Sequence, residues 1–301
     1  LIFLEEYMKI VKQKFGMLSD GTKVNLFTVK NDNMSFSCTD YGCTLTSIVL
    51  NNSNGKKTDI LYGYSTLEGY LNSKLCFGAI VGRFANRIGN ASFDIDGTVY
   101  SLDKNDGPNT LHGGFEGYDK MMWNSQIIEN KDFCGVKFTR LSKDNEQGFP
   151  GNVELTVTYL LDNNNNLSCI YNAKTDKATP INITNHAYFN LAGKGFIYDH
   201  LMKMNANYRL NVDSKLIPDG KLVDVSGTPF DFTNEKEIGC DIKKVGAGYD
   251  HCYVTEMYDP ENSQCGLPLD DTDLVEFCVV KDPKTNNEMT TFTNLEGCQF
   301  Y

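Results

Sequence analysis

The chain lacks the features of a nucleic-acid-binding or membrane-spanning protein. Its 28 lysines and arginines are outnumbered by 39 aspartates and glutamates, for a net charge of −11, whereas neutralising phosphates requires a basic face. The apolar run from Leu75 to Val81 is far too short to cross a bilayer. We therefore expect neither a nucleic-acid partner nor a membrane partner.

Arginine is scarce as well. Only Arg83, Arg87, Arg140 and Arg209 are present, and only the first two lie near the polar motifs described below. A phosphorylated ligand is typically bound by an arginine cluster, although lysines can serve as point charges. The composition therefore favours an uncharged ligand over a phosphorylated one.

Closely spaced cysteine pairs are missing too. The ten cysteines are scattered and include no CxxC motif: Cys38, Cys43, Cys76, Cys134, Cys169, Cys240, Cys252, Cys265, Cys278 and Cys298. No secretory segment is visible, because Leu1–Leu4 is followed at once by Glu5 and Glu6. We therefore expect reduced thiols, no metal site and a cytoplasmic protein.

Long amphipathic helical patterns are rare, and short alternating segments take their place. Apolar residues alternate with polar ones over Val153–Leu161, and the asparagine tract 163–166 separates this run from a second one over Leu167–Ala173. Such alternation is typical of half-buried antiparallel strands. With 26 glycines and 12% aromatic residues, the chain is predicted to be an all-β sandwich forming a single domain over residues 8–301.

One segment, residues 179–191, places a histidine among hydrogen-bonding side chains. Pro180 suits the start of a strand, and β-branched and aromatic residues follow it. Because side chains alternate along a strand, one face carries Asn182, Thr184, His186 and Tyr188, and the other carries Ile181, Ile183 and Asn185. A lone strand histidine is more often structural, so His186 becomes a catalytic candidate only together with the next cluster.

A second polar cluster lies upstream, around Asn86, Arg87 and His112. The dipeptide Asp96-Gly97 between two short apolar runs predicts a type I′ hairpin. This hairpin is expected to bring the three residues onto neighbouring strand ends. A guanidinium and an imidazole together suit recognition of several hydroxyl groups, although Arg87 alone could equally be an ion-pair partner.

At these motifs the chain resembles the aldose 1-epimerase, or galactose mutarotase, family. The resemblance extends along nearly the whole chain in motif order and spacing. It is carried by GRFANRIGNASFDIDGTVYSLDKNDGPNTLHGG at 82–114, GFPGNVELTVTYLL at 148–161, TPINITNHAYFNLAG at 179–193, GYDH at 248–251 and GCQFY at 297–301. It implies the large antiparallel supersandwich of that family.

The resemblance also implies a reaction and its residues. His186 would be the general acid that protonates the ring oxygen of an aldose. The sugar hydroxyls would be held by Asn86, Arg87, His112, Asp250 and Gln299. Opening a hemiacetal requires removing the proton of the anomeric hydroxyl while a proton is delivered to the ring oxygen, so no metal and no redox cofactor is needed. An imidazole with a pKa near ~6.5 can give and retake that proton. The remaining histidines, His200 and His251, are predicted to be structural.

One residue of the family pattern has no match in this chain. The resemblance places the general base, a glutamate, beyond the segment matching Gly297–Tyr301, and the local patterns of Glu276, Glu288 and Glu296 do not fit that role. Residues 1–7 also precede a natural-looking start at Met8. We hypothesise that the chain is part of a longer protein with extra N-terminal residues and further C-terminal strands, and that the chain ending at Tyr301 has little activity.

Two functional classes therefore remain. The first is an enzyme that interconverts the α and β anomers of D-galactose and also of D-glucose. The second is a non-catalytic sugar-binding relative. The complete set of hydroxyl-holding candidates favours the first. We expect an aldose as the small-molecule partner and a monomer or weak dimer.

Overall fold

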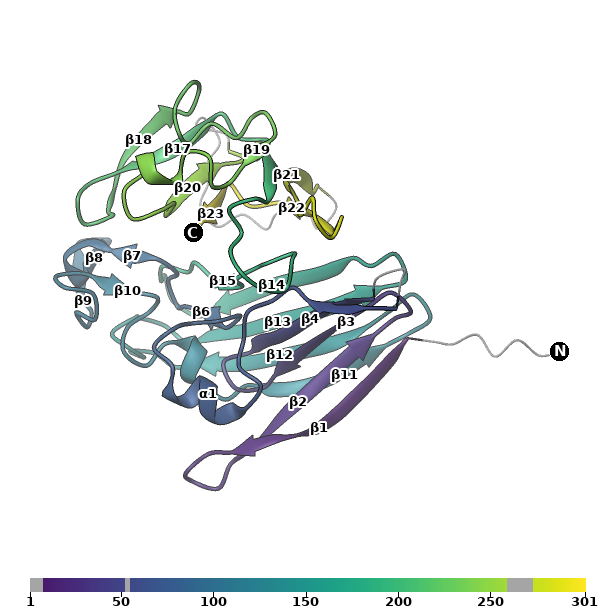
Figure 1. Cartoon of the computed structure of the whole chain (residues 1–301). Helices are drawn as coiled ribbons and strands as arrows, with labels where there is room; N and C mark the ends of the chain where they lie inside the picture. The colour runs from purple at the N-terminus through teal and green to yellow at the C-terminus, as the bar shows by residue number, and fades with distance from the viewer. Residues whose placement is uncertain (1–7, 52–54, 259–272) are drawn as a thin grey trace. The chain divides into compact units, whose positions relative to one another are not determined.

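The computed structural model describes residues 8–51, 55–258 and 273–301 (Figure 1). The predicted N-terminal extension, residues 1–7, lies outside the described residues. The chain forms two compact units, residues 1–189 and 190–301. This division does not test whether the units form one domain, so the single domain over 8–301 stays a prediction.

Unit 1 is built on two antiparallel sheets. The first has the order β1-β2-β3-β4-β5, with β1 (Lys9–Met17), β2 (Lys23–Lys30), β3 (Met34–Thr39), β4 (Thr44–Asn51) and β5 (Lys57–Asp59). The second has the order β11-β12-β13-β14, with β11 (Asn124–Glu129), β12 (Phe133–Ser142), β13 (Val153–Asp162) and β14 (Leu167–Thr175).

Aromatic side chains join the two sheets face to face. The rings of Phe27 on β2 and Phe138 on β12 meet edge to face with centroids 6.0 Å apart, and Phe36 on β3 meets Tyr159 on β13 at 6.3 Å. All four residues are buried to 1% exposure or less. Complete burial of such a side chain contributes about 1.5–3 kcal/mol, so this aromatic layer forms the core of a β-sandwich.

The alternation that predicted the central hairpin is confirmed. Val153, Leu155, Val157, Tyr159 and Leu161 are all buried, and the asparagine tract connects β13 to β14. Thr158, predicted to face away from the core, is nevertheless buried, with 8% of its surface exposed. Its lateral neighbours in the sheet are Lys137 on β12 and Ile170 on β14, two longer side chains that flank the threonine.

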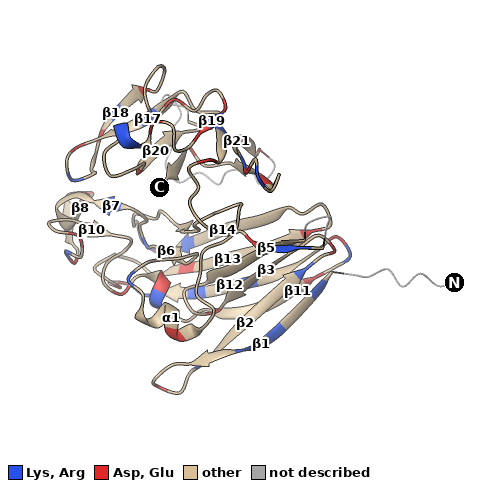
Figure 2. Ribbon diagram, in the orientation of Figure 1, with Lys and Arg blue, Asp and Glu red and all other residues tan. Residues whose placement is uncertain are grey.

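The edge strand of the first sheet is marked by lysines. Lys9, Lys12 and Lys14 lie along β1, which has a hydrogen-bonded neighbour, β2, on one side only (Figure 2). Charged side chains on an edge strand disfavour pairing with the edge of another chain. This arrangement accounts for the concentration of positive charge on one strand of an acidic protein.

Short elements surround the sandwich of unit 1. The hairpin of β8 (Ser92–Ile95) and β9 (Thr98–Ser101) is confirmed, with φ of 52° at Asp96 and 79° at Gly97, as a type I′ turn requires. Two pairs of two-residue strands join distant segments: β6 (Ile80–Val81) with β15 (Thr184–Asn185), and β7 (Arg87–Ile88) with β10 (Thr110–Leu111). The helical elements are α1 (Leu67–Asn72), η1 (Gly89–Ala91) and η2 (Tyr118–Lys120).

Arg83 connects four segments of unit 1 from inside the core. It is 2% exposed, and its guanidinium donates to the carbonyl oxygens of Pro150 at 2.7 Å, Gly151 at 3.1 Å and Lys143 at 3.1 Å. It also donates to the hydroxyls of Ser142 and Thr179. Arg83 is therefore a structural residue, although it lies three positions before Asn86.

Unit 2 also contains two four-stranded sheets. One has the order β19-β16-β21-β22, with β16 (Leu201–Met204), β19 (Lys236–Glu237), β21 (Val275–Lys281) and β22 (Glu288–Thr293). The other has the order β18-β17-β20-β23, with β17 (Tyr208–Val212), β18 (Pro218–Asp224), β20 (His251–Val254) and β23 (Gly297–Phe300). A short helix, η3 (Ile242–Lys244), precedes β20. Met202, Phe232, Tyr253 and Phe277 belong to one buried cluster of this unit.

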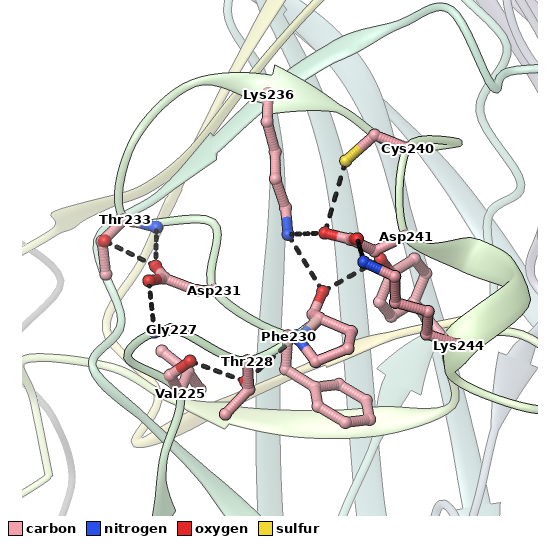
Figure 3. Close-up of polar contacts among 12 residues, drawn as sticks. Val225, Gly227, Thr228, Phe230, Asp231, Thr233, Lys236, Cys240, Asp241 and Lys244 are labelled. Carbon is pink, nitrogen blue, oxygen red and sulfur yellow. Dashed lines mark hydrogen bonds and ion pairs between the residues drawn. The ribbon is translucent and has the colours of Figure 1, made fainter.

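A polar network fixes the loops before and after β19 (Figure 3). Lys236 Nζ donates to the carbonyl oxygen of Pro229 and to Asp241, both at 3.0 Å, and Lys244 Nζ donates to the same carboxylate at 2.8 Å. Asp231 accepts from the amide of Gly227 and from Thr233. The partners of these charged groups all lie within the network, so we interpret it as structural.

The thiols and the fold class agree with the sequence predictions. Nine cysteines lie among the described residues and are free thiols, while Cys265 lies outside them. In the described part of the chain α1 is the single α-helix, and no helix there is long and apolar enough to span a membrane. The all-β prediction is confirmed.

Replacing Arg83 with methionine should destabilise unit 1 strongly, because buried carbonyl groups would lose their donors. We expect a loss of about 3 kcal/mol in the free energy of unfolding. Urea unfolding followed by Trp123 fluorescence measures this, since the chain's one tryptophan is buried in the same unit. The exposed Lys174→Met on β14 is the control. Equal unfolding midpoints for the two variants would contradict the assignment.

Candidate functional site

The segment carrying His186 is held by several neighbours in turn. Its regular strand is limited to β15, which pairs with β6, so the longer strand predicted over 179–191 is wrong in extent. Next to β15 the amide of His186 donates to the carbonyl oxygen of Ala79, and its carbonyl oxygen accepts from the amide of Gly78, both at 2.8 Å. Further along, the segment bonds a different neighbour: the carbonyl oxygen of Tyr188 accepts from the amide of Tyr62. The pairing with β6 therefore ends before Tyr188. The backbone of His186 is nevertheless fixed through both its amide and its carbonyl oxygen.

Side chains of this segment alternate as predicted. The rings of His186 and Tyr188 stack at 5.1 Å with an interplanar angle of 24°. Asn185, the last residue of β15, points the other way and donates to the carbonyl oxygen of Gly78 at 2.7 Å and to the hydroxyl of core residue Tyr159 at 3.0 Å. The imidazole therefore belongs to the face opposite the sandwich core.

Asn86 and His112 are joined by a reciprocal pair of hydrogen bonds. The amide of Asn86 donates to Nδ1 of His112 at 3.1 Å, and the amide of His112 donates to the carbonyl oxygen of Asn86 at 3.0 Å. Both residues have left-handed backbones, with φ of 64° and 53°, which costs energy in residues other than glycine. The two bonds stabilise this conformation, and the predicted meeting of Asn86, Arg87 and His112 on adjacent strand ends is confirmed.

The residue after His112 must be glycine. Gly113 has φ of +88°, and a Cβ atom there would lie 2.0 Å from the carbonyl oxygen of Gly82. No side chain fits at that distance. The backbone that follows His112 therefore lies directly against that of Gly82.

Arg87 is fixed at two points of its guanidinium. Nε donates to Asp106 at 2.7 Å, and Nη1 donates to the side-chain oxygen of Asn86 at 3.3 Å. The arginine side chain is 16% exposed. Arg87 is therefore an ion-pair partner, and it also contacts Asn86, which is bonded to His112. Its role in holding sugar hydroxyls stays a prediction.

His112 and His186 form the centre of this cluster. Their ring centroids are 5.2 Å apart and their planes are nearly perpendicular at 85°. Burial, followed by the nearby charges of His186 and Arg87, lowers the pKa of His112 to about 4, with Asp106 acting in the opposite direction. Because Nδ1 accepts the amide hydrogen of Asn86, the neutral ring carries its proton on Nε2. His112 is thus a neutral hydrogen-bond donor beside His186.

The two remaining site candidates lie together in unit 2. Asp250 immediately precedes β20, and Gln299 lies on β23 opposite Cys252. The side-chain amide of Gln299 donates to Asp250 Oδ1 at 2.7 Å. Four of the six candidates are therefore grouped in unit 1 and two in unit 2, each group with donors and acceptors suited to hydroxyl groups.

The other two histidines have contacts that support a structural interpretation. His200 is 2% exposed, and its Nε2 accepts from the amide of Leu191 at 3.1 Å. His251 accepts the amide hydrogen of Asp250 through Nδ1 at 3.1 Å and packs against Phe230 with centroids 4.5 Å apart. Glu276, Glu288 and Glu296, which the sequence did not fit to the base, are exposed on unit 2.

Sequence reasoning missed two residues that shape this cluster. Asp106 binds Arg87, and its only sequence signal is the turn motif Asp106-Gly107-Pro108. Phe77 meets Tyr188 in a T-shaped contact at 4.8 Å and 81°, and Tyr188 in turn stacks on His186. Within the described residues, no group of three or more His, Cys, Asp and Glu side chains is arranged to hold a metal ion.

Comparison with known proteins identifies the class to which this β-sandwich with its imidazole pair belongs. The family model described as aldose 1-epimerase matches residues 25–301. The chain therefore belongs to the aldose 1-epimerase family, as the sequence motifs predicted.

Individual relatives agree with this assignment. The chain is 38% identical to galactose mutarotase of Rattus norvegicus over 299 residues, covering 98% of this chain and 82% of the relative. It is 39% identical to aldose 1-epimerase of Escherichia coli K12 over 249 residues, covering 80% and 71%. Among solved structures, galactose 1-epimerase from Lactobacillus acidophilus matches with a TM-score of 0.78 and 29% identity, covering 91% of this chain and 77% of the other.

His112 should remain neutral far into the acid range. We expect its Cε1–H proton NMR signal to titrate with a midpoint at pH about 4 instead of near 6.5. Since the folded pKa is the lower one, the unfolded chain binds this proton more readily. The stability linked to His112 is therefore complete above pH 6.5 and is lost as the pH falls towards about 4. A midpoint near the ordinary value would contradict the buried, amide-bonded ring.

Proposed function

We propose that this protein interconverts the α and β anomers of aldohexoses, with D-galactose and D-glucose as substrates. The observation that carries the proposal is the perpendicular pair of imidazoles, His112 and His186, beside Asn86 and Arg87. Membership in the aldose 1-epimerase family and 38% identity to a galactose mutarotase support it.

His186 is the general acid of the proposed reaction. It delivers a proton to the ring oxygen while a base, which the family resemblance gives as a glutamate, takes one from the anomeric hydroxyl. The bond from C1 to the ring oxygen then breaks, and a carbonyl forms at C1. After rotation about the C1–C2 bond, the same groups act in reverse and the ring closes on the other face. The bond between C1 and the ring oxygen breaks and re-forms with proton transfers at each end, and the sugar keeps its oxidation state throughout. A positioned acid of this kind contributes about 10²- to 10⁴-fold in rate.

Asn86, Arg87 and His112 hold the sugar hydroxyls in this proposal. The guanidinium and the neutral His112 ring supply donors, and the side-chain amide of Asn86 provides both a donor and an acceptor. A hydroxyl group needs both, because it donates one hydrogen bond and accepts others. Since the pKa of His112 is lowered to about 4, this donor keeps its form throughout the neutral range and does not compete with His186 as an acid.

Asp250 and Gln299 extend the set of hydroxyl-holding residues in the proposal. Their mutual hydrogen bond leaves a carboxylate oxygen as an acceptor and an amide group as a donor and acceptor. The family resemblance gives removal of the anomeric proton to a glutamate, and we assign that role to none of Glu276, Glu288 and Glu296. We further propose a cytoplasmic protein, monomeric or weakly dimeric, that acts on a free sugar.

Substituting His186 should abolish most of the activity. We expect His186→Ala to lower turnover by about 100-fold or more, as loss of a positioned acid does. Polarimetry on freshly dissolved α-D-galactose, with protein expressed from the full transcript, measures the rate of relaxation to the anomeric equilibrium. A variant that keeps most of its turnover would remove His186 from the acid role.

Added imidazole serves as the control for this substitution. Free imidazole should restore part of the turnover of His186→Ala, after subtraction of the rate with imidazole alone, and should not stimulate the wild type. An unchanged unfolding midpoint by Trp123 fluorescence would show that the fold is intact. Galactose binding without turnover in the wild type would instead favour a non-catalytic sugar-binding protein.

A methyl galactoside should bind without reacting. Its methylated anomeric oxygen has no proton to lose, so ring opening cannot begin, while its other hydroxyls still reach Asn86, Arg87 and His112. We expect competitive inhibition of galactose anomerisation, with an inhibition constant within about tenfold of the KM for galactose. Absence of inhibition at concentrations far above that KM would show that these residues do not provide the main binding energy.

A further inference from the structure

Asp106 is the acidic partner of Arg87, and hydrogen bonds within its own loop hold it in place. The amide and carbonyl of Asp106 exchange hydrogen bonds with those of Asn109, at 3.1 and 3.0 Å. Asn109, which is 3% exposed, accepts the amide hydrogen of Asn90 through its side chain at 3.1 Å. The carboxylate of Asp106 therefore projects from a turn tied to a buried residue.

The rest of this loop is bonded in the same way. Asn105 donates to the carbonyl oxygen of Leu111 at 2.9 Å and accepts its amide hydrogen at 2.7 Å. The hydroxyl of the buried Thr110 donates to the carbonyl oxygen of Asp103 at 2.7 Å. Leu111 pairs with Arg87 across β10 and β7. The loop between residues 103 and 111 is thus connected through its backbone to the strand that carries Arg87.

We infer that Asp106 is a positioning residue, which orients the guanidinium of Arg87 for the sugar. Asp106 accepts a hydrogen bond from Nε, and Asn86 accepts one from Nη1. Among the described residues, Nη2 has no hydrogen-bond partner. Two contacts at different nitrogens fix both the plane and the rotation of a rigid group. They leave the two hydrogens of Nη2 in a set direction for a pair of hydroxyls. This inference rests on the proposed function.

Asp106 also balances the charge of the site. Arg87 lowers the pKa of His112 and Asp106 raises it, so both charges act on the same ring. Without the carboxylate, the partly buried guanidinium would keep its charge, and its contact at Nε would be weaker, because a neutral acceptor binds it less strongly than a carboxylate. It would then sample several orientations, and each bound sugar would have to select one of them.

The test compares Asp106→Asn with Asp103→Asn. Both substitutions remove one negative charge from the same loop, but Asp103 is exposed and none of its side-chain contacts involves Arg87. We expect Asp106→Asn to lower kcat/KM for galactose by about tenfold or more, mainly through a higher KM, because Arg87 holds a hydroxyl in ground state and transition state alike. Asp103→Asn should stay within about twofold of the wild type. Equal effects of the two substitutions would overturn the inference.

A double substitution separates positioning from a general structural effect. In an Arg87→Lys background, Asp106→Asn should have little further effect on KM, because the group that Asp106 orients is already changed. If Asp106 only stabilised the loop, the two substitutions would add, and the unfolding midpoint followed by Trp123 would fall with kcat/KM. Additive effects together with a lowered midpoint would reject a positioning role.

A spectroscopic measurement distinguishes failure of this inference from failure of the proposed function. The Nε–H group of Arg87 should give a slowly exchanging ¹⁵N NMR signal in the wild type that broadens or disappears in Asp106→Asn and persists in Asp103→Asn. This holds whether or not galactose is turned over. An inactive wild type with this signal would overturn the proposed function, whereas an active wild type with no change on Asp106→Asn would overturn the inference.

Discussion

The reciprocal hydrogen bonds between Asn86 and His112 are the constraint on which the local site depends. They stabilise two left-handed residues that would otherwise relax. They also determine the tautomer of His112, because a ring nitrogen that accepts an amide hydrogen cannot carry a proton. The two members of this pair also make the further contacts of the cluster: His112 meets His186, and Asn86 accepts from Arg87.

The cluster around His112 and His186 carries little uncompensated charge, which fits an uncharged ligand. The one guanidinium of the cluster is balanced by Asp106, and burial keeps His112 neutral by lowering its pKa to about 4. Arg83, the nearest other arginine in the sequence, bonds backbone carbonyls inside the core. An anion would meet little positive charge here, whereas a sugar needs directional donors and acceptors.

Rigid surroundings hold these groups in place. The backbone of His186 is bonded to Ala79 and Gly78, and its ring stacks on Tyr188, which also contacts Phe77. The loop that carries Asp106 is bonded to buried residues. Side chains supported in this way need little reordering when a ligand binds, which preserves binding energy.

Local sequence patterns determined the elements of this protein. Alternation over Val153–Leu161 predicted a strand and its buried face, Asp96-Gly97 predicted a type I′ hairpin, and the motifs around Asn86, His112 and His186 identified the family. These succeeded because the period of a strand and the positive φ of a turn are properties of neighbouring residues. Tertiary structure alone decided that the strand at His186 is regular only over Thr184–Asn185, that Arg83 is buried while Arg87 binds Asp106, and that His112 is held neutral. The physical reason is that each of these outcomes depends on residues distant in the chain, whose burial and hydrogen bonds no local pattern contains.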